Sequence, residues 1–413
     1  MDNTIVIVGG GLVGATAACA WADGPFRVTV VESGPAAVEW PPAAGFDPQV
    51  SALTRASQRV FQHVGVWDAI AARRVAPYQA MEVWDAASPG RIRFDAEDLG
   101  EPDLGHIVEN SAILAALRER LEAAANVEFL AETTVTGLQA DADAARLSLG
   151  DGRVLEAGLV VGADGSDSWV RDQAGITTTG WDYDQSAVVA VVRTERPHEA
   201  TARQCFLSTG PVAFLPMADP HRCTVVWSTT PVEAAGLAAA DEAAFLAALQ
   251  EAFGDSLGRM EETGPRRSFP LRLQHADDYV RPRIALIGNA AHAIHPLAGQ
   301  GLNLGVLDAA ALAEVTERGR AAGRGPGALS VLRRYERWRK GDNVAVMAAM
   351  DGFERLFGGH AAPVRWLRGA GMRLTGAVGP VRHALMRRAM GLTGDLPGRA
   401  RAGWRAQSER LHT

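Results

Sequence analysis

Short apolar runs along the chain alternate with stretches of helical pattern. Four of these runs are rich in Ile, Val and Leu and predict buried strands. They are residues 5–8, 27–31, 159–161 and 284–287. Residues 15–21, which are mostly small, and residues 306–315 predict helices that follow such runs. Strands that alternate with helices are typical of an α/β fold built on a parallel sheet.

A glycine-rich turn lies between the first apolar run and the first helix. Its three spaced glycines fit the dinucleotide fingerprint: the first makes a tight turn, the second admits a pyrophosphate, and the third lets helix and strand pack closely. An acid at the end of the second strand falls where a carboxylate binds the ribose hydroxyls of adenosine, and it disfavours a 2′-phosphate. The residues expected to bind this part of a dinucleotide are Gly9, Gly11, Leu12, Val13, Gly14 and Glu32.

The run at residues 288–305 is the most informative part of the chain. It reads Gly-Asn-Ala-Ala-His-Ala-Ile-His-Pro-Leu-Ala-Gly-Gln-Gly-Leu-Asn-Leu-Gly and lies between the last strand and a helix. Glycines at this density let the backbone lie flat against a planar or anionic ligand, with N–H groups free to donate. Its candidate cofactor residues are Gly288, Asn289, Pro296, Gly299, Gln300, Gly301, Leu302 and Asn303.

A third segment, residues 159–171, runs from a buried strand through Asp164 and Gly165 into the start of a helix. Ser168 is placed to cap that helix, and Arg171 is placed to pair with a carboxylate. Taken alone, the segment is an ordinary strand-to-helix turn. Taken with the two glycine-rich segments, it makes Asp164, Gly165 and Arg171 candidate cofactor residues.

Together, the three segments resemble the three fingerprints of class A flavoprotein monooxygenases: the glycine motif, the Asp-Gly motif and the motif at the ribityl chain of the flavin. Within that group the chain resembles the ubiquinone-biosynthesis hydroxylases, which hydroxylate the ring of prenylated phenols. The resemblance runs nearly from end to end, and Gly-Gln-Gly-Leu-Asn-Leu-Gly is its most specific part. Other segments that resemble this family are 50–53, 65–67, 108–111, 210–211, 214–216, 268–271, 350–353, 388–392 and 394–397.

The resemblance implies FAD as the cofactor and NAD(P)H as a transient co-substrate that reduces it. O2 then adds to the reduced flavin as a C4a-hydroperoxide, whose distal oxygen attacks an electron-rich phenol ring. The expected substrate is a polyprenylated phenol of ubiquinone biosynthesis. His295 and Pro296, in the flavin loop, are the candidate catalytic residues, although a histidine in such a loop is more often structural.

Two positions depart from the family pattern. The ribityl position is usually Asp in the wider class and here is Asn289, whose amide oxygen can still accept a hydrogen bond but carries no charge. Where the family commonly has Arg, this chain has Gln49. If that Arg contacts the pyrophosphate, one charge-assisted hydrogen bond worth about 1.5–3 kcal/mol is missing here. Arg55 is the candidate replacement.

Pattern and resemblance together predict an α/β fold with a discontinuous Rossmann-like FAD-binding domain, a β-sheet substrate domain and a helical C-terminal tail. The FAD-binding domain is expected to comprise residues 1–75, 101–180 and 276–353. The two insertions, 76–100 and 181–275, are expected to form a sheet that covers the flavin ring. Their strand and helix patterns lie at 81–84, 187–193, 212–215, 223–228 and 241–253, the last of these being helical.

Residues 354–413 are expected to form a basic helical C-terminal region. They contain eleven Arg, no Lys and three acids, a net charge of +8 in a chain whose total is −7. Apolar positions recur beside the arginines, so the region is expected either to lie on anionic lipid or to dock on the acidic body of the protein. A prenylated substrate favours the membrane, because each buried methylene is worth about 0.8 kcal/mol and a long tail resists leaving lipid.

The start of the chain lacks the pattern of a signal peptide, and no apolar stretch is long enough to span a bilayer. The three cysteines, Cys19, Cys205 and Cys223, show no metal or redox spacing and are expected to be buried or incidental thiols in a reducing cytoplasm. We therefore expect a cytoplasmic enzyme, peripheral to the inner membrane or served by a lipid-presenting partner, with no metal and no nucleic acid.

Three other functions stay open on the sequence alone. A hydroxylase of another aromatic compound or secondary metabolite would share all three motifs and differ only in its pocket. A flavin reductase acting on prenyl chains would share the first two motifs but is not expected to carry the 288–305 run in this form. A non-catalytic flavin-fold scaffold subunit is the third, and Gln49 gives it slight support. Bound yellow FAD and substrate-stimulated NAD(P)H oxidation separate an enzyme from a scaffold.

Overall fold

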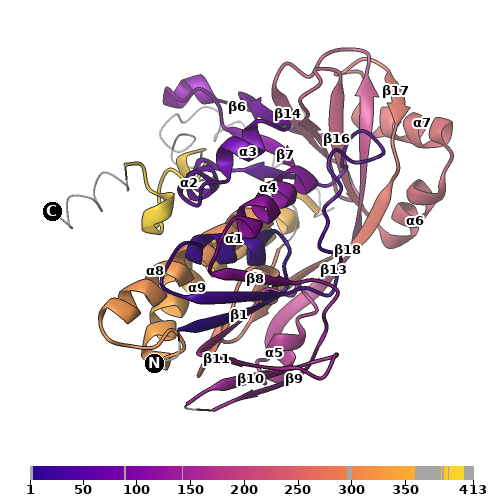
Figure 1. Cartoon of the computed structure of the whole chain (residues 1–413). Coiled ribbons are helices and arrows are strands. Elements are labelled where there is room, and N and C mark those ends of the chain that lie inside the picture. The colour runs from indigo at the N-terminus through magenta and orange to yellow at the C-terminus, as the bar shows by residue number, and fades with distance from the viewer. Residues whose placement is uncertain are drawn as a thin grey trace.

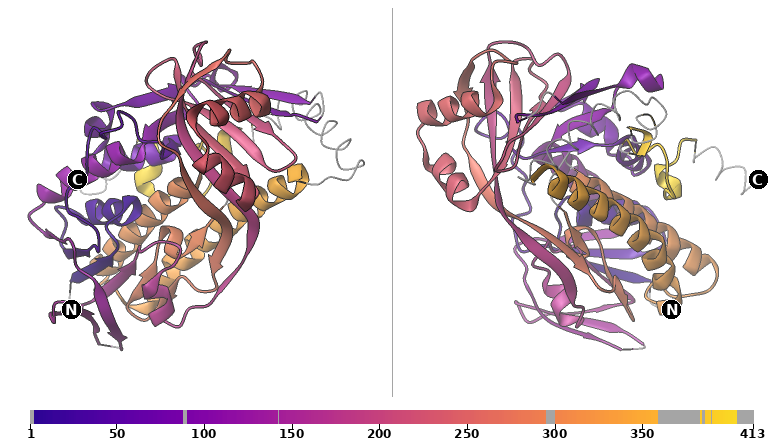
Figure 2. Two further views of the ribbon diagram at one scale, coloured as in Figure 1. Left: turned by 90° about the vertical axis from the view of Figure 1, so that its right-hand side faces the viewer. Right: turned by 180° about the vertical axis from the view of Figure 1, so that it is seen from behind.

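A computed structural model describes residue 383 and residues 3–87, 90–141, 143–294, 300–358, 386–388 and 390–403. Two parts lie side by side and are joined by long strands (Figure 1). The first contains the N-terminal strand β1 (Thr4–Val8) and the long helices α8 (Gln300–Ala321) and α9 (Leu329–Gly358). The second is a large sheet with helices α6 (Pro231–Ala239) and α7 (Glu242–Phe253) on its outer face (Figure 2).

A six-stranded sheet forms the centre of the first part. All neighbouring strands in it are parallel except the pair β19–β20. Ile and Val side chains are buried on both faces of β1, as expected for a central strand of a parallel sheet. All four predicted strands are confirmed, to within a residue at their ends. In spatial order the strands are β19 (Val280–Arg281), β20 (Ile284–Leu286), β12 (Leu159–Gly162), β1, β2 (Arg27–Val31) and β8 (Val127–Leu130).

Helix α1 (Leu12–Trp21) follows β1 after the glycine turn and begins three residues before its predicted start. It is mostly small and mostly buried, and it packs against α4 (Asn110–Glu122) and α8. Trp21 at its end donates its indole N–H to Thr316 of α8 at 3.0 Å. Around this centre lie α2 (Arg55–His63), α3 (Trp67–Ala71), α5 (Trp169–Gln173), β3 (Val50–Leu53), β4 (Val75–Tyr78), β7 (Gly105–Glu109), β9 (Val135–Ala140), β10 (Ala145–Leu149) and β11 (Val154–Ala157).

The second part is a nine-stranded mixed sheet. Alternate residues of its longest strand, Val188, Ala190 and Val192, face a cluster that α7 covers. The predicted strands and the predicted helix of the insertions are confirmed, and Asp241 caps α7 by accepting from the N–H of Ala244 at 2.8 Å. The strands are β21 (His292–Ala293), β18 (Arg267–Ala276), β13 (Thr178–Thr194), β16 (Arg222–Thr229), β15 (Pro211–Pro216), β14 (Thr201–Phe206), β5 (Ala80–Asp85) and β6 (Arg91–Asp95), with β17 (Met260–Thr263) on β13.

The two long strands β13 and β18 run from one part of the molecule to the other (Figure 1). Their pairing is interrupted by a bulge between Asp182 and Gln185. At the other edge of β18, the short strand β21 pairs His292 with His275. The glycine-rich run at 288–305 is therefore hydrogen-bonded directly to the sheet of the second part.

The predicted domain boundaries at 75/76, 180/181 and 353/354 fall inside secondary-structure elements. Strand β4 spans the first, strand β13 spans the second, and helix α9 continues past the third. The six-stranded sheet does draw its strands from three separated stretches of chain. The exact boundaries between the two domains stay a prediction.

Part of the basic C-terminal region docks on the body of the protein. Arg388 pairs with Asp342 of α9 at 2.9 Å, and Arg399 pairs with Glu317 of α8 at 2.6 Å. Within residues 386–403, docking on acidic groups is thus the alternative that the structure supports. Most of the region, including most of the apolar positions expected to lie on lipid, falls outside the described residues. Met386, one of those positions, is described, and it is buried against Leu104 and Met390. Among the helices that are described, none has the length and apolarity needed to cross a membrane.

We predict that Phe214→Ala weakens the second part without changing the first. Phe214 is fully buried and stacks on Phe253 with ring centroids 3.9 Å apart. Its truncation is expected to lower the free energy of unfolding by about 3–5 kcal/mol, measured by denaturant titration. Val154→Ala, at a position 57% exposed, is the control and should change it by no more than about 0.5 kcal/mol. Equal effects of the two variants would contradict the assigned core.

Candidate functional site

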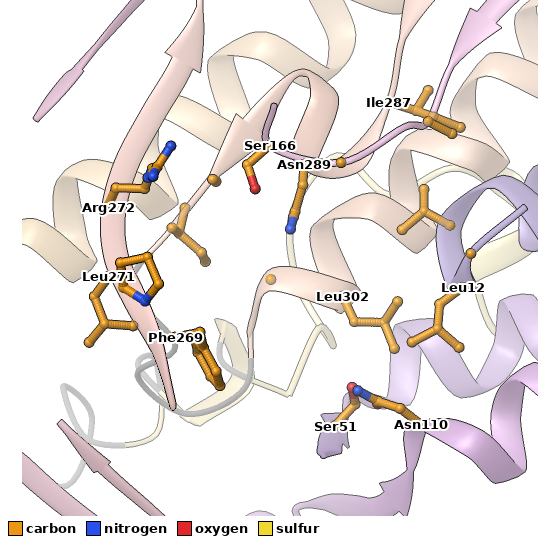
Figure 3. A pocket seen from close by; sticks show the side chains of 18 of the residues that line it. Leu12, Ser51, Asn110, Ser166, Phe269, Leu271, Arg272, Ile287, Asn289 and Leu302 are labelled. Carbon is orange, nitrogen blue, oxygen red and sulfur yellow. The ribbon is translucent and has the colours of Figure 1, made fainter. Parts of the chain in front are cut away.

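A cavity of about 450 Å³ opens between the two parts, at the carboxyl ends of β1, β12 and β20. This is where ligands bind in open α/β sheets. Residues from all three sequence segments line it, and strand β18 supplies the facing wall (Figure 3). The lining residues include Gly11, Leu12, Val13, Gly165, Ser166, Ile287, Asn289, Gly301 and Leu302, with Phe269, Pro270, Leu271 and Arg272 opposite.

The three glycines of the first turn have the geometry that the fingerprint requires. Gly9 has φ +99°, and a Cβ there would lie 2.4 Å from the carbonyl oxygen of Ala163. A Cβ on Gly14 would lie 1.9 Å from the carbonyl oxygen of Gly9. A Cβ on Gly11 would meet nothing within 4 Å, so the backbone is open to the cavity there. Together with the N-terminus of α1, this turn fits a dinucleotide pyrophosphate.

Glu32 lies beside this turn. One of its carboxylate oxygens accepts from the N–H of Gly10 and the other from the N–H of Gly34, both at 2.7 Å. The nearby Arg118 stacks on Phe129, with its guanidinium carbon 3.5 Å from the ring centroid. Burial lowers the pKa of Arg118, and the charge of Glu32 opposes that shift. Glu32 is thus held at the end of β2, where the fingerprint places the ribose acid.

The 288–305 run comes to the same cavity through a tight turn. Gly288 has φ +58°, and a Cβ on it would lie 3.0 Å from Val13. A Cβ on Gly305 would lie 2.5 Å from Val13, so the first and the last motif touch at this residue. Asn289 follows Gly288 and points its amide into the open middle of the cavity (Figure 3). Gly301 and Leu302, at the start of α8, line the opposite side.

The Asp-Gly segment joins the site mainly through its backbone. Asp164 accepts from the hydroxyl of Ser168 at 2.6 Å and from the N–H of Val170 at 3.0 Å, so its side chain caps α5. The predicted cap by Ser168 is confirmed, since its hydroxyl accepts from the N–H of Arg171 at 3.0 Å. The guanidinium of Arg171 donates to the carbonyl of Ala290 at 3.4 Å, which ties this segment to the turn at residues 288–292.

Not every described candidate residue lines the cavity. Those absent from its lining are Gly9, Gly14, Glu32, Arg55, Asp164, Arg171, Gly288 and Asn303. Two of them, Arg55 and Asn303, bind partners away from the three motif turns. Arg55 pairs with Asp103 at 2.9 Å and is absent from the described lining, so its use as a substitute for the missing Arg is not supported. The side chain of Asn303 is 2% exposed and instead accepts from the N–H of Thr54 at 2.9 Å and donates to the carbonyl of Ala52 at 2.8 Å. Asn303 joins α8 to the β3–α2 junction rather than facing the ligand.

Several predicted site residues lie outside the part of the chain that the structure describes. His295, Pro296 and Gly299 fall outside the described residues, and Gln300 is described only as the first residue of α8. Their assigned roles stay predictions. Gln49 is exposed and does not line the cavity among the described residues, whereas its neighbours Val50 and Ser51 do.

Sequence reasoning missed part of the cavity wall. Ser51 donates to the side-chain oxygen of Asn110 at 2.7 Å, and both residues line the cavity opposite Asn289 (Figure 3). Phe269 and Leu271 form the apolar wall on β18. These residues lie in segments that carried the family resemblance, but their residue types indicate no particular chemistry. That resemblance was the only signal able to find them.

The cysteines are buried, as predicted, and none lines the cavity among the described residues. Burial raises the pKa of the Cys19 and Cys223 thiols to about 12 and that of Cys205 to about 11. Thiols with such pKa values remain protonated at neutral pH and are poor nucleophiles.

Comparison with solved structures identifies the fold. The chain superposes on p-nitrophenol 4-monooxygenase PnpA from Pseudomonas putida with a TM-score of 0.76 and 21% identity, covering 94% of this chain and 99% of that one. That likeness is one of fold. The fold is that of FAD-dependent aromatic monooxygenases, and residues of all three sequence segments line the cavity.

The chain belongs to the FAD binding domain family, whose model matches residues 2–347. It is 39% identical over 388 residues to the ubiquinone hydroxylase UbiL of Rhodospirillum rubrum, covering 94% of this chain and 89% of that protein. It is 37% identical over 390 residues to the 3-demethoxyubiquinol 3-hydroxylase of Escherichia coli, covering 94% and 98%. The protein is therefore an FAD-dependent aromatic hydroxylase of the class that uses NAD(P)H.

We predict that Gly11→Ala and Gly14→Ala separate cofactor binding from folding. At Gly11 the backbone φ of −68° suits alanine, so the free energy of unfolding of the apoprotein should change by less than about 1 kcal/mol. The added methyl enters the cavity and should weaken FAD binding by about tenfold or more, a loss of at least about 1.4 kcal/mol.

At Gly14 the methyl meets backbone at 1.9 Å, and the apoprotein should lose about 1–3 kcal/mol. Flavin fluorescence titration and denaturant unfolding measure the two effects. A Gly11→Ala variant that binds FAD as tightly as the wild type would contradict the assigned pyrophosphate position.

Proposed function

We propose that this chain hydroxylates the aromatic ring of a polyprenylated phenol in ubiquinone biosynthesis, with FAD, NAD(P)H and O2. Relatives that align with most of the chain are named for ubiquinone hydroxylation and for 3-hydroxylation of demethoxyubiquinol. The observation that carries the proposal is the cavity at which all three motifs meet, with an apolar wall on β18 facing them.

Bound FAD supplies the oxygen-activating chemistry of the reaction. The residues of the chain bind and orient it. We assign the pyrophosphate to the backbone N–H groups at the N-terminus of α1, beside Gly11, and the adenosine ribose to Glu32. We assign the ribityl chain to Asn289, whose amide can both accept from and donate to its hydroxyls. In this arrangement, β18 would supply the wall of the cavity beside the reactive ring.

The wall formed by Phe269 and Leu271 supports an aromatic substrate with a long apolar chain. Apolar side chains there would also exclude water from the reacting atoms, which limits side reactions. We keep His295 and Pro296 as the candidates beside the reacting ring. Their proposed roles are to accept a hydrogen bond from the phenol and to shape the loop against the flavin.

A polyprenyl chain also constrains where the enzyme meets its substrate. At about 0.8 kcal/mol for each buried methylene, such a chain does not leave lipid unaided. We propose that the protein works at the surface of the inner membrane or receives its substrate from a lipid-presenting partner. Binding of the purified protein to vesicles with and without anionic lipid distinguishes the two routes.

We predict that a host deleted for this gene loses ubiquinone and accumulates a prenylphenol that lacks one ring hydroxyl. Mass spectrometry of lipid extracts measures both, and the missing hydroxyl identifies the ring position. The wild-type gene should restore the quinone, whereas Gly11→Ala should restore less in proportion to its lost FAD.

An unchanged quinone pool would contradict the proposed substrate. The purified holoenzyme gives the second reading. NAD(P)H oxidation stimulated by another aromatic compound would indicate a hydroxylase of a different pathway. Bound FAD without any substrate-stimulated NAD(P)H oxidation would indicate a scaffold subunit.

A further inference from the structure

A buried cluster of charged groups lies behind the turn at residues 288–292, which we call the flavin turn. Asp308 from α8, Arg339 from α9 and His292 from β21 all have side chains that are 0% exposed. None of the three is in the described lining of the cavity. The chemistry proposed above uses none of them, so their burial needs another explanation.

The carboxylate of Asp308 accepts four hydrogen bonds. One oxygen accepts from the N–H of Gly288 at 3.2 Å and from Nε2 of His292 at 2.5 Å. The other accepts from Nε of Arg339 at 2.9 Å and from the side-chain amide of Asn343 at 3.1 Å. Four is close to the full acceptor capacity of a carboxylate, so each oxygen is committed.

The two oxygens have different tasks. The first holds both ends of the short turn between residues 288 and 292, which carries Asn289 into the cavity. The second is held by groups of α9, which anchor the carboxylate from behind. The position of the turn is therefore set by α8 and α9 together.

The hydrogen bond between Asp308 and His292 also connects this cluster to the sheet that carries the wall on β18. His292 belongs to β21, which pairs with β18 in the register that puts His292 opposite His275. Strand β18 continues to Leu271 and Phe269 in the cavity wall. One carboxylate thus contacts both the turn that faces the ribityl chain and the strand next to the substrate wall.

Electrostatics agree with an ionised Asp308. Burial alone raises the pKa of this carboxyl, but the charges of His292 and Arg339 and their hydrogen bonds outweigh burial and hold it below its usual value. A buried ion pair adds little net stability compared with apolar side chains of similar volume. A role in fixing geometry accounts for the burial of these charges in a way that stability does not.

We propose that Asp308, anchored by Arg339, is a positioning residue that sets the flavin turn relative to the substrate strand. It does not touch the reacting atoms, and it acts through Gly288 and His292. This inference rests on the proposed function only in that the flavin is placed at Asn289. Loss of this positioning should lower the coupling, that is, the hydroxylated product formed for each NAD(P)H oxidised. Hydroxylation depends on the relative position of flavin and substrate.

The test is Asp308→Asn in the holoenzyme. The amide nitrogen cannot accept, so either the turn or its anchor loses its hydrogen bonds, while the shape of the side chain is kept. We expect the variant to bind FAD and to oxidise NAD(P)H, with hydroxylated product per NAD(P)H reduced about tenfold or more and H2O2 increased accordingly. The visible circular dichroism of the bound flavin should change as well.

Glu314→Gln is the matched control. Glu314 is also a buried carboxylate of α8, but it accepts from the N–H of Gly398 at 2.7 Å, away from the flavin turn. It should resemble the wild type in coupling and in flavin dichroism. If Asp308→Asn does not fold, His292→Phe releases one end of the turn only and should reduce coupling by a smaller factor.

Wild-type coupling and dichroism in a folded Asp308→Asn variant would overturn the inference. The same holds if the control and the variant lose coupling equally. The dichroism is read without substrate, so it is independent of the proposed reaction. A wild type that fails to hydroxylate prenylphenols, combined with altered dichroism in Asp308→Asn, would overturn the proposed substrate and support the positioning role.

Discussion

The structure depends on a close approach of backbones for which only glycine leaves room. A side chain on Gly14 would collide with the carbonyl of Gly9, and one on Gly9 would collide with the carbonyl of Ala163. On the other side, Val13 occupies the space that Gly288 and Gly305 leave open. These contacts bring three segments that are far apart in sequence to one point. The cavity lies at this point, and the three segments line it without occupying it.

The second constraint is that the glycine-rich run and the wall on β18 are joined by backbone hydrogen bonds. Strand β21 belongs to the glycine-rich run and pairs with β18, which carries the apolar wall. With the flavin at Asn289, as we propose, a shift of either strand would move it relative to the wall on β18. Buried hydrogen bonds to Asp308 hold this junction from behind. The packing of α8 on α9 therefore also sets the position of the turn that faces the cavity.

Local patterns predicted the elements well, because an apolar run such as that of β1 or a capped helix such as α7 is determined mainly by its own residues. Roles that depend on distant partners were predicted less well. Asn303 faces Thr54 and Arg55 faces Asp103, and neither partner can be inferred from the motif that contains the residue. Phe269 and Leu271 are ordinary strand residues by pattern, and only the pairing of β18 makes them a wall of the site.

The central claim is that the three segments hold one FAD in this cavity. A crystal structure of the protein with its flavin tests it most directly. The account predicts one FAD in each chain, with its adenosine ribose at Glu32, its pyrophosphate beside Gly11 and its ribityl chain at Asn289. Electron density for the flavin outside the cavity, or a pyrophosphate away from the N-terminus of α1, would contradict it.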